Sequence, residues 1–159
     1  MTDTAALQFG QAEPGVAYKD RPAAFGIAQR DRRIAMVKVS KEGATPWFDL
    51  PGGALDPGED DAAALVREFG EETGLIVRPG ALVLRASQRF FKAEGEPVNN
   101  RSGHYLAEIT GEDAKLKIED DHQLVWFDPR DALVRLRHDS HAWAVLSWLR
   151  ALDRTAADD

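Results

Sequence analysis

The sequence predicts an α/β domain in which helices cover a mostly antiparallel or mixed β-sheet. Short runs of β-branched and aromatic residues, typical of strands, outnumber the helical segments. Two segments, 60–73 and 140–153, instead repeat their apolar residues every three to four positions, as amphipathic helices do. The 159 residues, 43% of them hydrophobic, fit one domain over 1–159, whose ends at about 1–15 and 154–159 are expected to be flexible.

The amino-terminal half predicts two strands and an extended segment. Residues 23–28 and 34–39 read as apolar strands, and the turn-forming sequence QRDRR between them predicts a β-hairpin. After a polar loop, the segment WFDLPGGAL at 47–55 is predicted to be extended, because Pro51 and two glycines disfavour a helix there.

The segment 60–73 is predicted to be the first helix. Asp60 and Asp61 stand at its start, where carboxylates suit the positive end of the helix dipole. Gly74 supplies its end, because glycine tolerates the left-handed conformation that commonly closes a helix. The core-facing positions of this helix are expected at Ala62, Leu65, Val66 and Phe69.

The carboxyl-terminal half predicts three more strands and a second helix. Residues 81–91 and 103–110 alternate as strands on either side of a polar loop at 92–102, and a final strand follows at 123–128. The last helix spans 140–153, and its apolar face is predicted at Ala142, Val145, Leu146, Leu149 and Leu152.

Composition excludes several classes of protein. The formal net charge of −7 argues against a broad surface for nucleic acid or anionic membranes. The chain has no cysteine, which excludes disulfides, thiolate metal sites and cysteine nucleophiles. Because it has neither a signal-peptide pattern nor a run of about 18 apolar residues, we expect a cytoplasmic protein, off the membrane, that acts on small partners.

Three glutamates crowd the end of the first predicted helix. Glu68, Glu71 and Glu72 fall within one wedge of the helix surface, next to Arg67. Like charges at this spacing each destabilise a helix by roughly 0.2–0.5 kcal/mol, and anions are also disfavoured in the last turn. A Mg²⁺ ion, which prefers carboxylate oxygens, would offset this repulsion. The alternative is a solvated acidic face with Arg67 as ionic partner.

The same glutamates belong to a longer pattern. It reads Gly53, five residues, Glu59, seven residues, Arg67-Glu68-Phe69, one residue, Glu71-Glu72, one residue, Gly74-Leu75. This pattern resembles the complete Nudix box. The resemblance is closest over residues 50–77, where LPGG precedes the box and ETGL closes it, and the order of the surrounding elements also agrees.

The resemblance implies a fold, a reaction and a set of ligands. The fold would be a Nudix-type α/β/α sandwich with a central mixed β-sheet. The reaction would be Mg²⁺-dependent hydrolysis, with Mn²⁺ as a substitute, of a nucleoside diphosphate linked to another group. By position, the metal ligands would be Glu68, Glu71, Glu72 and the backbone carbonyl of Gly53. Glu68 and Glu71, together with Arg67, would be the catalytic residues of the box.

Other residues of the box would support these ligands. The resemblance implies that Arg67 orients the glutamates and that Glu59 is its ionic partner. Gly52 lets the loop before the helix fold tightly, so that backbone can approach metal or phosphate, and Gly74 ends the helix.

The general base that takes the proton of the attacking water stays open, because relatives use either a box glutamate or a residue on a distant loop. Glu119 is the first candidate outside the box, since it precedes the last strand, and Asp120 is the second. His122 could be a base, but a single histidine at the start of a strand is more often structural. His138 and His141 share a helical spacing without a third ligand nearby, so no zinc site is expected.

For the residues that would contact the substrate, the sequence leaves a structural alternative open in each case. Arg85 and Arg89 alternate onto one side of the strand at 81–91, where they could hold phosphates that are not transferred or simply be surface charge. Four aromatic residues are available to stack on a base or to pack in the core: Trp47, Phe48, Phe91 and Tyr105. Trp143 and Trp148 are expected in packing or in a dimer contact.

The resemblance leaves the substrate open. Nucleoside triphosphates, ordinary or oxidised, are the leading class, with release of pyrophosphate or phosphate; dinucleoside polyphosphates, ADP-ribose and nucleotide sugars are alternatives. A non-catalytic nucleotide-binding module would not need the complete carboxylate set. The isomerase branch of the superfamily relies on a cysteine, which this chain lacks. We expect no DNA-binding domain, because only one or two short helices are predicted after the last strand. We expect a monomer or a homodimer.

Overall fold

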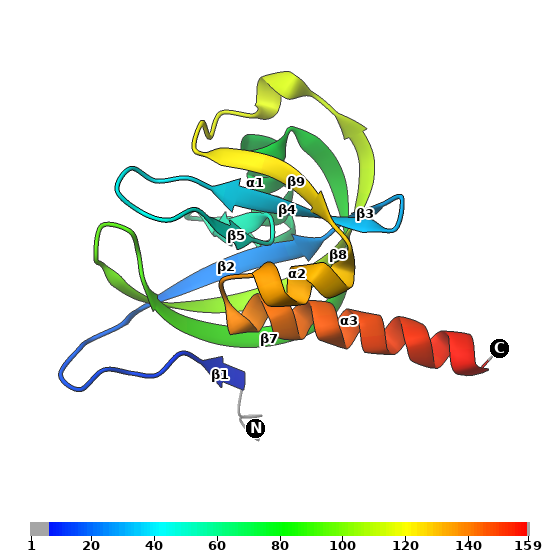
Figure 1. Cartoon of the computed structure of the whole chain (residues 1–159). Coiled ribbons are helices and arrows are strands. Elements are labelled where there is room, and N and C mark those ends of the chain that lie inside the picture. Colours follow the sequence, from blue (N-terminus) through cyan, green and yellow to red (C-terminus); the bar gives the residue numbers. More distant parts are fainter. Residues whose placement is uncertain (1–6, 159) are drawn as a thin grey trace.

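The computed structural model describes residues 7–158 and arranges them as two β-sheets covered by helices (Figure 1). Its elements are, in chain order, β1 (Leu7–Phe9), β2 (Lys19–Ile27), β3 (Gln29–Arg30), β4 (Arg33–Val39), β5 (Trp47–Asp49), β6 (Gly52–Ala54), α1 (Asp61–Thr73), β7 (Leu75–Phe91), β8 (Pro97–Glu112), the 3₁₀ turn η1 (Ala114–Leu116), β9 (His122–Phe127), α2 (Pro129–Arg135) and α3 (Asp139–Asp158). Residues 1–6 and 159, part of the ends expected to be flexible, lie outside the described residues. Within 7–158, no helix is both long enough and apolar enough to cross a membrane.

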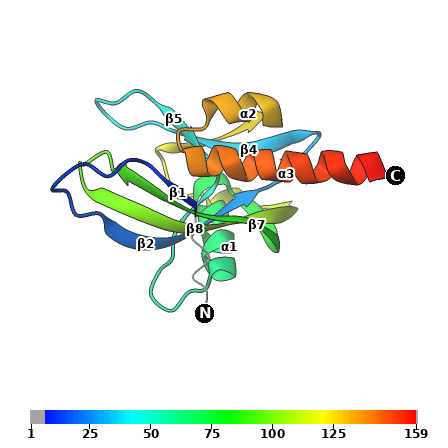
Figure 2. The same cartoon turned by 90° about the horizontal axis from the view of Figure 1, so that it is seen from below.

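The two sheets differ in strand direction. The first has the order β1-β7-β8-β2-β6, and it is mixed, because β1 runs parallel to β7 and β2 parallel to β8, whereas β7 and β8 are antiparallel. The second joins β3, β4 and β5, with β9 also pairing antiparallel to β4. Helices α1 and α3 lie on opposite sides of the strands (Figure 2). The predicted α/β sandwich around a central mixed sheet is confirmed.

Strand β2 contributes to both halves of the core. Phe25 and Ile27 point into the cluster under α3, whereas Ala24 belongs to the cluster under α1. Gly26 also faces α1, where a Cβ atom would come within 2.6 Å of the Phe69 ring. Because side chains alternate along a strand, one strand supplies buried surface to both helical layers.

Helix α1 begins and ends where the sequence predicts. The side chain of Asp60 caps its start by accepting the backbone N–H of Ala63 at 2.8 Å. Gly74, with a φ of 76°, ends the helix in the left-handed conformation, and its N–H donates to the carbonyl of Gly70. Both predicted signals are confirmed.

The buried face of α1 differs from the predicted one. Leu65 and Phe69 are fully buried, but Ala62 and Val66 face solvent, and Val66 is 41% exposed. Glu72, only 5% exposed, occupies the next position on the buried face. The helix is turned toward the loop before it because the Glu72 carboxylate is hydrogen-bonded to that loop.

The predicted hairpin between residues 23–28 and 34–39 forms only at its tip, where the N–H of Ala35 donates to the carbonyl of Ala28 at 2.9 Å. Both segments are strands, within β2 and β4, but they belong to different sheets. The tight turn at Asp31 and Arg32, with φ values of 51° and 63°, joins β4 to the short strand β3 instead. Residues 23–25 of β2 cannot pair with β4 because β8 and β6 occupy both edges of the strand there.

Strands β7 and β8 are longer than predicted. Strand β7 starts at Leu75, directly after α1, and β8 includes residues 97–102, which the sequence predicts as loop. The connection therefore shortens to residues 92–96. Asn99 and Asn100 have loop-like composition, but both are buried in β8 between β7 and β2, where tertiary pairing outweighs local propensity.

Two helices follow the last strand. The short helix α2 was not expected, and α3 runs to Asp158, past its predicted end, extending beyond the sheets in Figure 1. Of the predicted apolar face of α3, Val145 is buried, but Leu146 and Leu152 are 46% and 47% exposed. Trp148 is buried instead, because α3 packs on both β7 and α2.

Three histidines are buried together beneath α3. His104 lies on β8, His138 in the turn before α3 and His141 within α3, and the His141 ring is 5.4 Å from each of the other two. Burial lowers the pKa of His104 to about 4, that of His138 to about 3 and that of His141 well below its usual value. The folded state therefore requires neutral imidazoles.

We predict that Gly26→Ala destabilises the fold and that Gly70→Ala does not. The added Cβ at Gly26 collides with the ring of Phe69, and overpacking of this kind costs about 1–3 kcal/mol. At Gly70, the nearest atom is 3.5 Å away, and alanine in a helix is about 0.5–1 kcal/mol more favourable than glycine. Urea unfolding of both variants measures the difference. Equal stabilities would contradict this packing.

We predict a loss of stability in mild acid that depends on His104. Its pKa is near 4 when folded and near 6.5 when unfolded, so its contribution is complete above pH 6.5 and is lost as the pH falls toward 4. Between pH 7 and pH 5, His104→Leu should lose about 2 kcal/mol less unfolding free energy than the parent chain. Denaturant titrations at both pH values test this. Parallel losses would show that His104 does not titrate on unfolding.

Candidate active site

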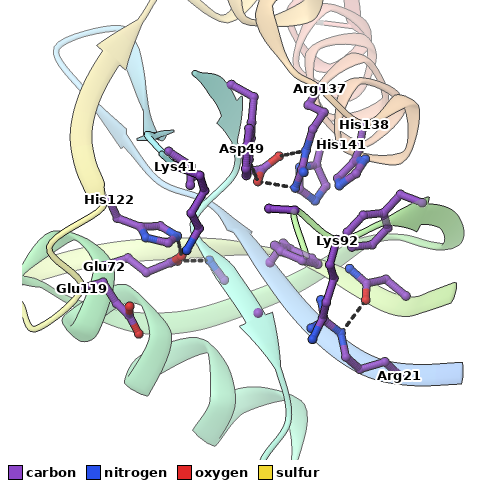
Figure 3. A pocket seen from close by; sticks show the side chains of 18 of the residues that line it. Arg21, Lys41, Asp49, Glu72, Lys92, Glu119, His122, Arg137, His138 and His141 are labelled. Carbon is purple, nitrogen blue, oxygen red and sulfur yellow. Dashed lines mark hydrogen bonds and ion pairs between the residues drawn. The ribbon is translucent and has the colours of Figure 1, made fainter. Parts of the chain in front are cut away.

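A cavity of about 460 Å³ is lined by strands of both sheets, by α1 and by the turn before α3 (Figure 3). Figure 3 shows Glu72 and Glu119 on one side of it and Arg21 and Lys92 on another. Arg137 lies at the end nearest α3. Acidic and basic groups therefore face the same space from different elements.

Arg67 on α1 uses all five of its N–H donors. Its Nε and Nη2 atoms each donate to Glu59 at 2.8 Å, and Nη2 also donates to the carbonyl of Ala54 at 3.0 Å. Its Nη1 atom donates to Glu68 at 3.0 Å and to Glu71 at 3.1 Å. The hydrogen bond from Arg67 lowers the pKa of Glu59 to about 2. The expected pairing of Arg67 with Glu59 is present, and the same guanidinium holds two box glutamates.

Glu68 lies against the loop before α1. A Cβ atom at Gly53 would fall 2.8 Å from the Glu68 carboxylate, so glycine leaves the room that this carboxylate occupies. Burial raises the pKa of Glu68, and the charges of Glu71 and Glu119 raise it further, while Arg67 opposes the rise. The crowding inferred from the helix spacing is therefore present in three dimensions.

Glu72 is the most buried of the box glutamates. The backbone N–H of Gly52 donates to its Oε1 at 2.8 Å, and His122 Nε2 lies 2.9 Å from its Oε2. Gly52 has a φ of 143°, and a Cβ atom there would lie 2.2 Å from the carbonyl oxygen of Ala24. Burial raises the pKa of Glu72, and the contact with His122 opposes that rise. Only glycine, which has no side chain, fits at position 52 and brings its backbone N–H to the Glu72 carboxylate.

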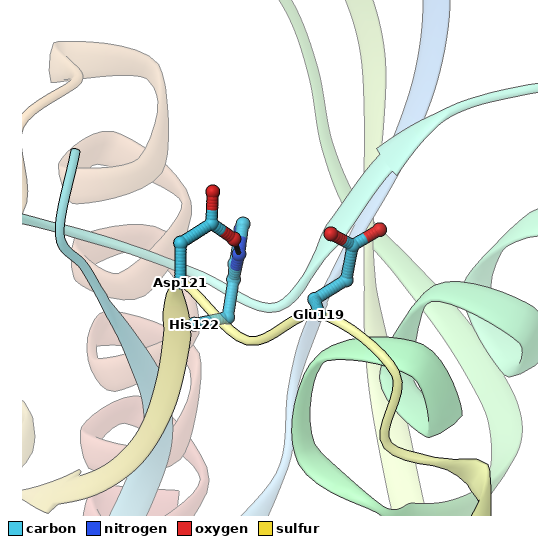
Figure 4. Close-up of side chains that lie close together, drawn as sticks. All are labelled: Glu119, Asp121 and His122. Carbon is cyan, nitrogen blue, oxygen red and sulfur yellow. Dashed lines mark hydrogen bonds and ion pairs between the residues drawn. The ribbon is translucent and has the colours of Figure 1, made fainter. Parts of the chain in front are cut away.

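Glu119, Asp121 and His122 form a candidate metal-binding cluster at the start of β9 (Figure 4). One ligand atom from each lies within 4.8 Å of the others. The backbone N–H of Glu119 donates to the carbonyl of Glu71 at 3.1 Å, which ties this loop to the end of α1. Asp120, the second candidate for the base, is exposed. Of the two, Glu119 is the residue that lines the cavity.

His122 connects this cluster to the box. Its Nε2 contacts Glu72, and its Nδ1 lies 2.7 Å from Asp121, which also pairs with Lys41. Burial opposes protonation of the imidazole, but the two carboxylates raise its pKa above the usual value. The ring thus links the buried glutamate to the loop before β9.

These side chains fit a hard divalent cation. Glu72, Glu119 and Gly53 line the cavity, and the Glu68 carboxylate lies against Gly53 within reach of the charges of Glu71 and Glu119. Mg²⁺ and Mn²⁺ prefer such an oxygen set, whereas structural zinc prefers thiolates and imidazoles. The donor chemistry therefore suits the cation that the box implies.

Positive charge faces the carboxylates across the cavity. Arg21 on β2 donates from Nε to Asn100 at 2.8 Å, and burial lowers its pKa. Lys92, in the connection between β7 and β8, pairs with Glu96 at 3.1 Å. Guanidinium and ammonium groups are the usual partners of phosphate oxygens.

The four residues predicted to bind substrate lie outside this cavity. Arg85 and Tyr105 hydrogen-bond to each other at 3.2 Å beside the start of α1. Arg89 donates to a backbone carbonyl near the amino terminus at 3.1 Å, and Phe48 packs edge-on against Phe127. Arg85 and Arg89 share one side of β7, and the neighbouring residue Phe90, on the other side, lines the cavity.

The cavity also contains residues that the sequence patterns did not indicate. They include Arg21, Lys41, Asp49, Phe90, Lys92, Asn100 and Arg137. Each is a single residue of ordinary type in its own element, so no local spacing connects them. Trp47, one of the four aromatic candidates, does line the cavity.

Comparisons with known proteins agree with the box. Residues 19–149 match the family model of the NUDIX domain. An RNA pyrophosphohydrolase of Sphingopyxis alaskensis is 29% identical over 107 residues, which cover 61% of this chain and 67% of that protein. An ADP-ribose pyrophosphatase of Methanocaldococcus jannaschii is 39% identical over 61 residues, but these cover only 38% of this chain and 36% of that protein.

Solved structures show the same fold. A NUDIX hydrolase from Nitrosomonas europaea is 20% identical, with a TM-score of 0.69 over 84% of this chain and 90% of that chain. A MutT NUDIX hydrolase from Burkholderia pseudomallei is 26% identical, with a TM-score of 0.59 over 81% of this chain and 98% of that chain. The range matched by the family model, 19–149, contains the whole box and every residue that lines the cavity. The chain therefore belongs to the NUDIX family of hydrolases.

Proposed function

We propose that this chain hydrolyses a phosphoric anhydride bond of nucleoside triphosphates, ordinary or oxidised, with Mg²⁺ or Mn²⁺ as cofactor. The observation that carries the proposal is one cavity in which Glu72 and Glu119 face Arg21 and Lys92. A polyphosphate chain carries negative charges that a cation held by the carboxylates and the two basic side chains would neutralise. The names of the relatives, an RNA pyrophosphohydrolase and an ADP-ribose pyrophosphatase, support the bond class.

In this proposal, the cation is held by Glu68, Glu71 and Glu72 with the carbonyl of Gly53. When bound, it would neutralise phosphate charge and lower the pKa of a coordinated water. Arg67 keeps Glu68 and Glu71 oriented through the hydrogen bonds from its Nη1 atom. Its bonds to the loop before α1 hold that orientation against the repulsion between the carboxylates.

The remaining roles go to residues on the loops. We assign the role of general base, which accepts the proton of the attacking water, to Glu119. Its carboxylate lines the cavity and makes no hydrogen bond within residues 7–158. We assign to Arg21 and Lys92 the binding of those phosphates that are not transferred. Arg85 and Arg89 are not assigned this role because their side chains are hydrogen-bonded outside the cavity. Within the described part of the chain, the cavity has one aromatic end, which favours a substrate with a single base over a dinucleoside polyphosphate.

The proposal predicts Mg²⁺-dependent turnover of nucleoside triphosphates that requires Glu71. In a phosphate-release screen, nucleoside triphosphates should exceed dinucleoside polyphosphates, ADP-ribose and nucleotide sugars, and a chelator should abolish the activity. Glu71→Gln should lower kcat by about a hundredfold or more, because it removes a charged ligand of the cation. Product analysis identifies the bond that breaks.

Glu108→Gln is the matched control for this screen, because Glu108 pairs with Arg78 on the exposed surface. It should retain full activity. Full activity of Glu71→Gln would refute the assignment of the ligands. Nucleotide binding without turnover of any substrate would instead identify a binding module.

We further predict that Arg67→Lys weakens cation binding while the chain stays folded. A lysine cannot reproduce the five hydrogen bonds to the loop and to the two glutamates. Loss of such an outer-shell partner typically raises a metal dissociation constant by about 10-fold to 100-fold. Mn²⁺ titration followed by electron paramagnetic resonance measures this constant without any substrate. Arg78→Lys is the surface control, and equal Mn²⁺ affinity in the two variants would exclude the orienting role of Arg67.

A further inference from the structure

The end of the cavity beneath α3 is built from three separate segments. Trp47 and Asp49 come from β5, Phe90 from β7 and Arg137 from the turn between α2 and α3. The guanidinium carbon of Arg137 lies 4.5 Å from the centre of the Trp47 ring and 5.2 Å from the centre of the Phe90 ring. A planar cation is thus placed over two aromatic rings, away from Glu72 and Glu119 (Figure 3).

Arg137 is held in this position by one edge of its guanidinium. Nε and Nη2 donate to Asp49 at 3.3 and 2.8 Å, as Figure 3 shows, and the indole N–H of Trp47 donates to the same carboxylate at 3.1 Å. The backbone N–H of Arg137 donates to the carbonyl of Phe48 at 2.9 Å. These contacts organise this end of the cavity before a ligand binds, which lowers the entropy cost of binding.

The other edge of the guanidinium is available to a ligand. A guanidinium carries five N–H donors in one plane, and Asp49 takes the two on the Nε and Nη2 side. The outward donors of Nη1 and Nη2 make no hydrogen bond to any residue in 7–158. Because the group is planar and rigid, these two donors point away from Asp49, side by side. A ligand that fits them carries two adjacent acceptors.

We propose that this end of the cavity binds the base of a 6-oxopurine nucleotide, guanine or hypoxanthine, through the free edge of Arg137 and the face of Trp47. The O6 and N7 atoms of such a base are adjacent acceptors that match an arginine fork. Adenine presents an amino donor beside N7, which would oppose an N–H group. A base bonded in this way lies in the plane of the Arg137 guanidinium. The base and the guanidinium together then stack on the rings of Trp47 and Phe90. The inference rests on the proposed function, because it names the substrates of the same site.

A phosphate group is less suited to this edge than a base. The charge of Arg137 is balanced by Asp49, whose side chain is only 14% exposed. Arg21, in contrast, has a neutral amide, Asn100, as its hydrogen-bond partner within residues 7–158. An anionic group is therefore attracted to Arg21, whose guanidinium forms no salt bridge within residues 7–158, and the aromatic end is left for the base.

The kinetic test compares kcat/KM for GTP, ITP, ATP and methyl triphosphate, which has no base. We expect GTP and ITP to be equal and each to exceed ATP by about tenfold. Arg137→Lys keeps the charge but lacks the planar fork, so the ratio of ITP to ATP should fall from about ten to about one. An unchanged ratio in a folded Arg137→Lys variant would overturn the inference.

A second pair of variants tests the stacking face. Trp47→Leu should lower kcat/KM for the three nucleotides by about tenfold or more relative to methyl triphosphate, because one stacked base is lost. The matched control is Trp143→Leu, since Trp143 is 50% exposed and packs against Phe9 outside the cavity. It should leave every ratio unchanged. Thermal unfolding confirms that each variant is folded, and equal ratios in the two variants would contradict stacking on Trp47.

A binding measurement separates this inference from the proposed hydrolysis. Calorimetric titration of the metal-free protein with GMP, IMP and AMP should give affinities for GMP and IMP about tenfold above that for AMP. Equal affinities would overturn the inference, and so would a preference for GMP over IMP, which would place recognition at the 2-amino group. If GMP and IMP are preferred but no triphosphate is hydrolysed, the proposed function fails and the base site stands.

Discussion

The five hydrogen bonds of Arg67 are the interaction on which the candidate site depends. Three of them reach Glu59 and Ala54 in the segment before α1, and two reach Glu68 and Glu71. Because a guanidinium is planar and rigid, it fixes the loop relative to the helix and holds two carboxylates side by side despite their repulsion. The arrangement therefore offers oxygen ligands to a cation without a large rearrangement of the backbone.

The rest of the cavity is aligned to this helix by contacts of a different kind. The N–H of Gly52 binds Glu72, and the N–H of Glu119 binds the carbonyl of Glu71, so the segments before β6 and β9 are both tied to α1. Phe25 belongs to the core under α3 and also lines the cavity. Strand β2 carries Arg21 on the basic side of the cavity and packs against both helical layers.

Local signals predicted the structure well wherever the interactions are local. Asp60 and Gly74 mark the ends of α1 because capping involves only the neighbouring turn. Hydrophobic periodicity misplaced Val66, since it does not include the hydrogen bond that turns Glu72 toward the loop. Asn99 was assigned to a loop by composition, but its backbone is paired on both sides by β7 and β2, which only the assembled sheet supplies.

The sequence by itself determined the family and the composition of the acidic side of the cavity. Residues three and four apart on a helix share a face in any fold, so the spacing of the box alone brings Glu71 to Arg67 and places Glu68 beside Glu71 and Glu72. Only the tertiary structure decided that Arg21 and Arg137 face the same cavity. These residues stand more than a hundred positions apart, and their approach depends on strand pairing and helix packing that no local spacing encodes.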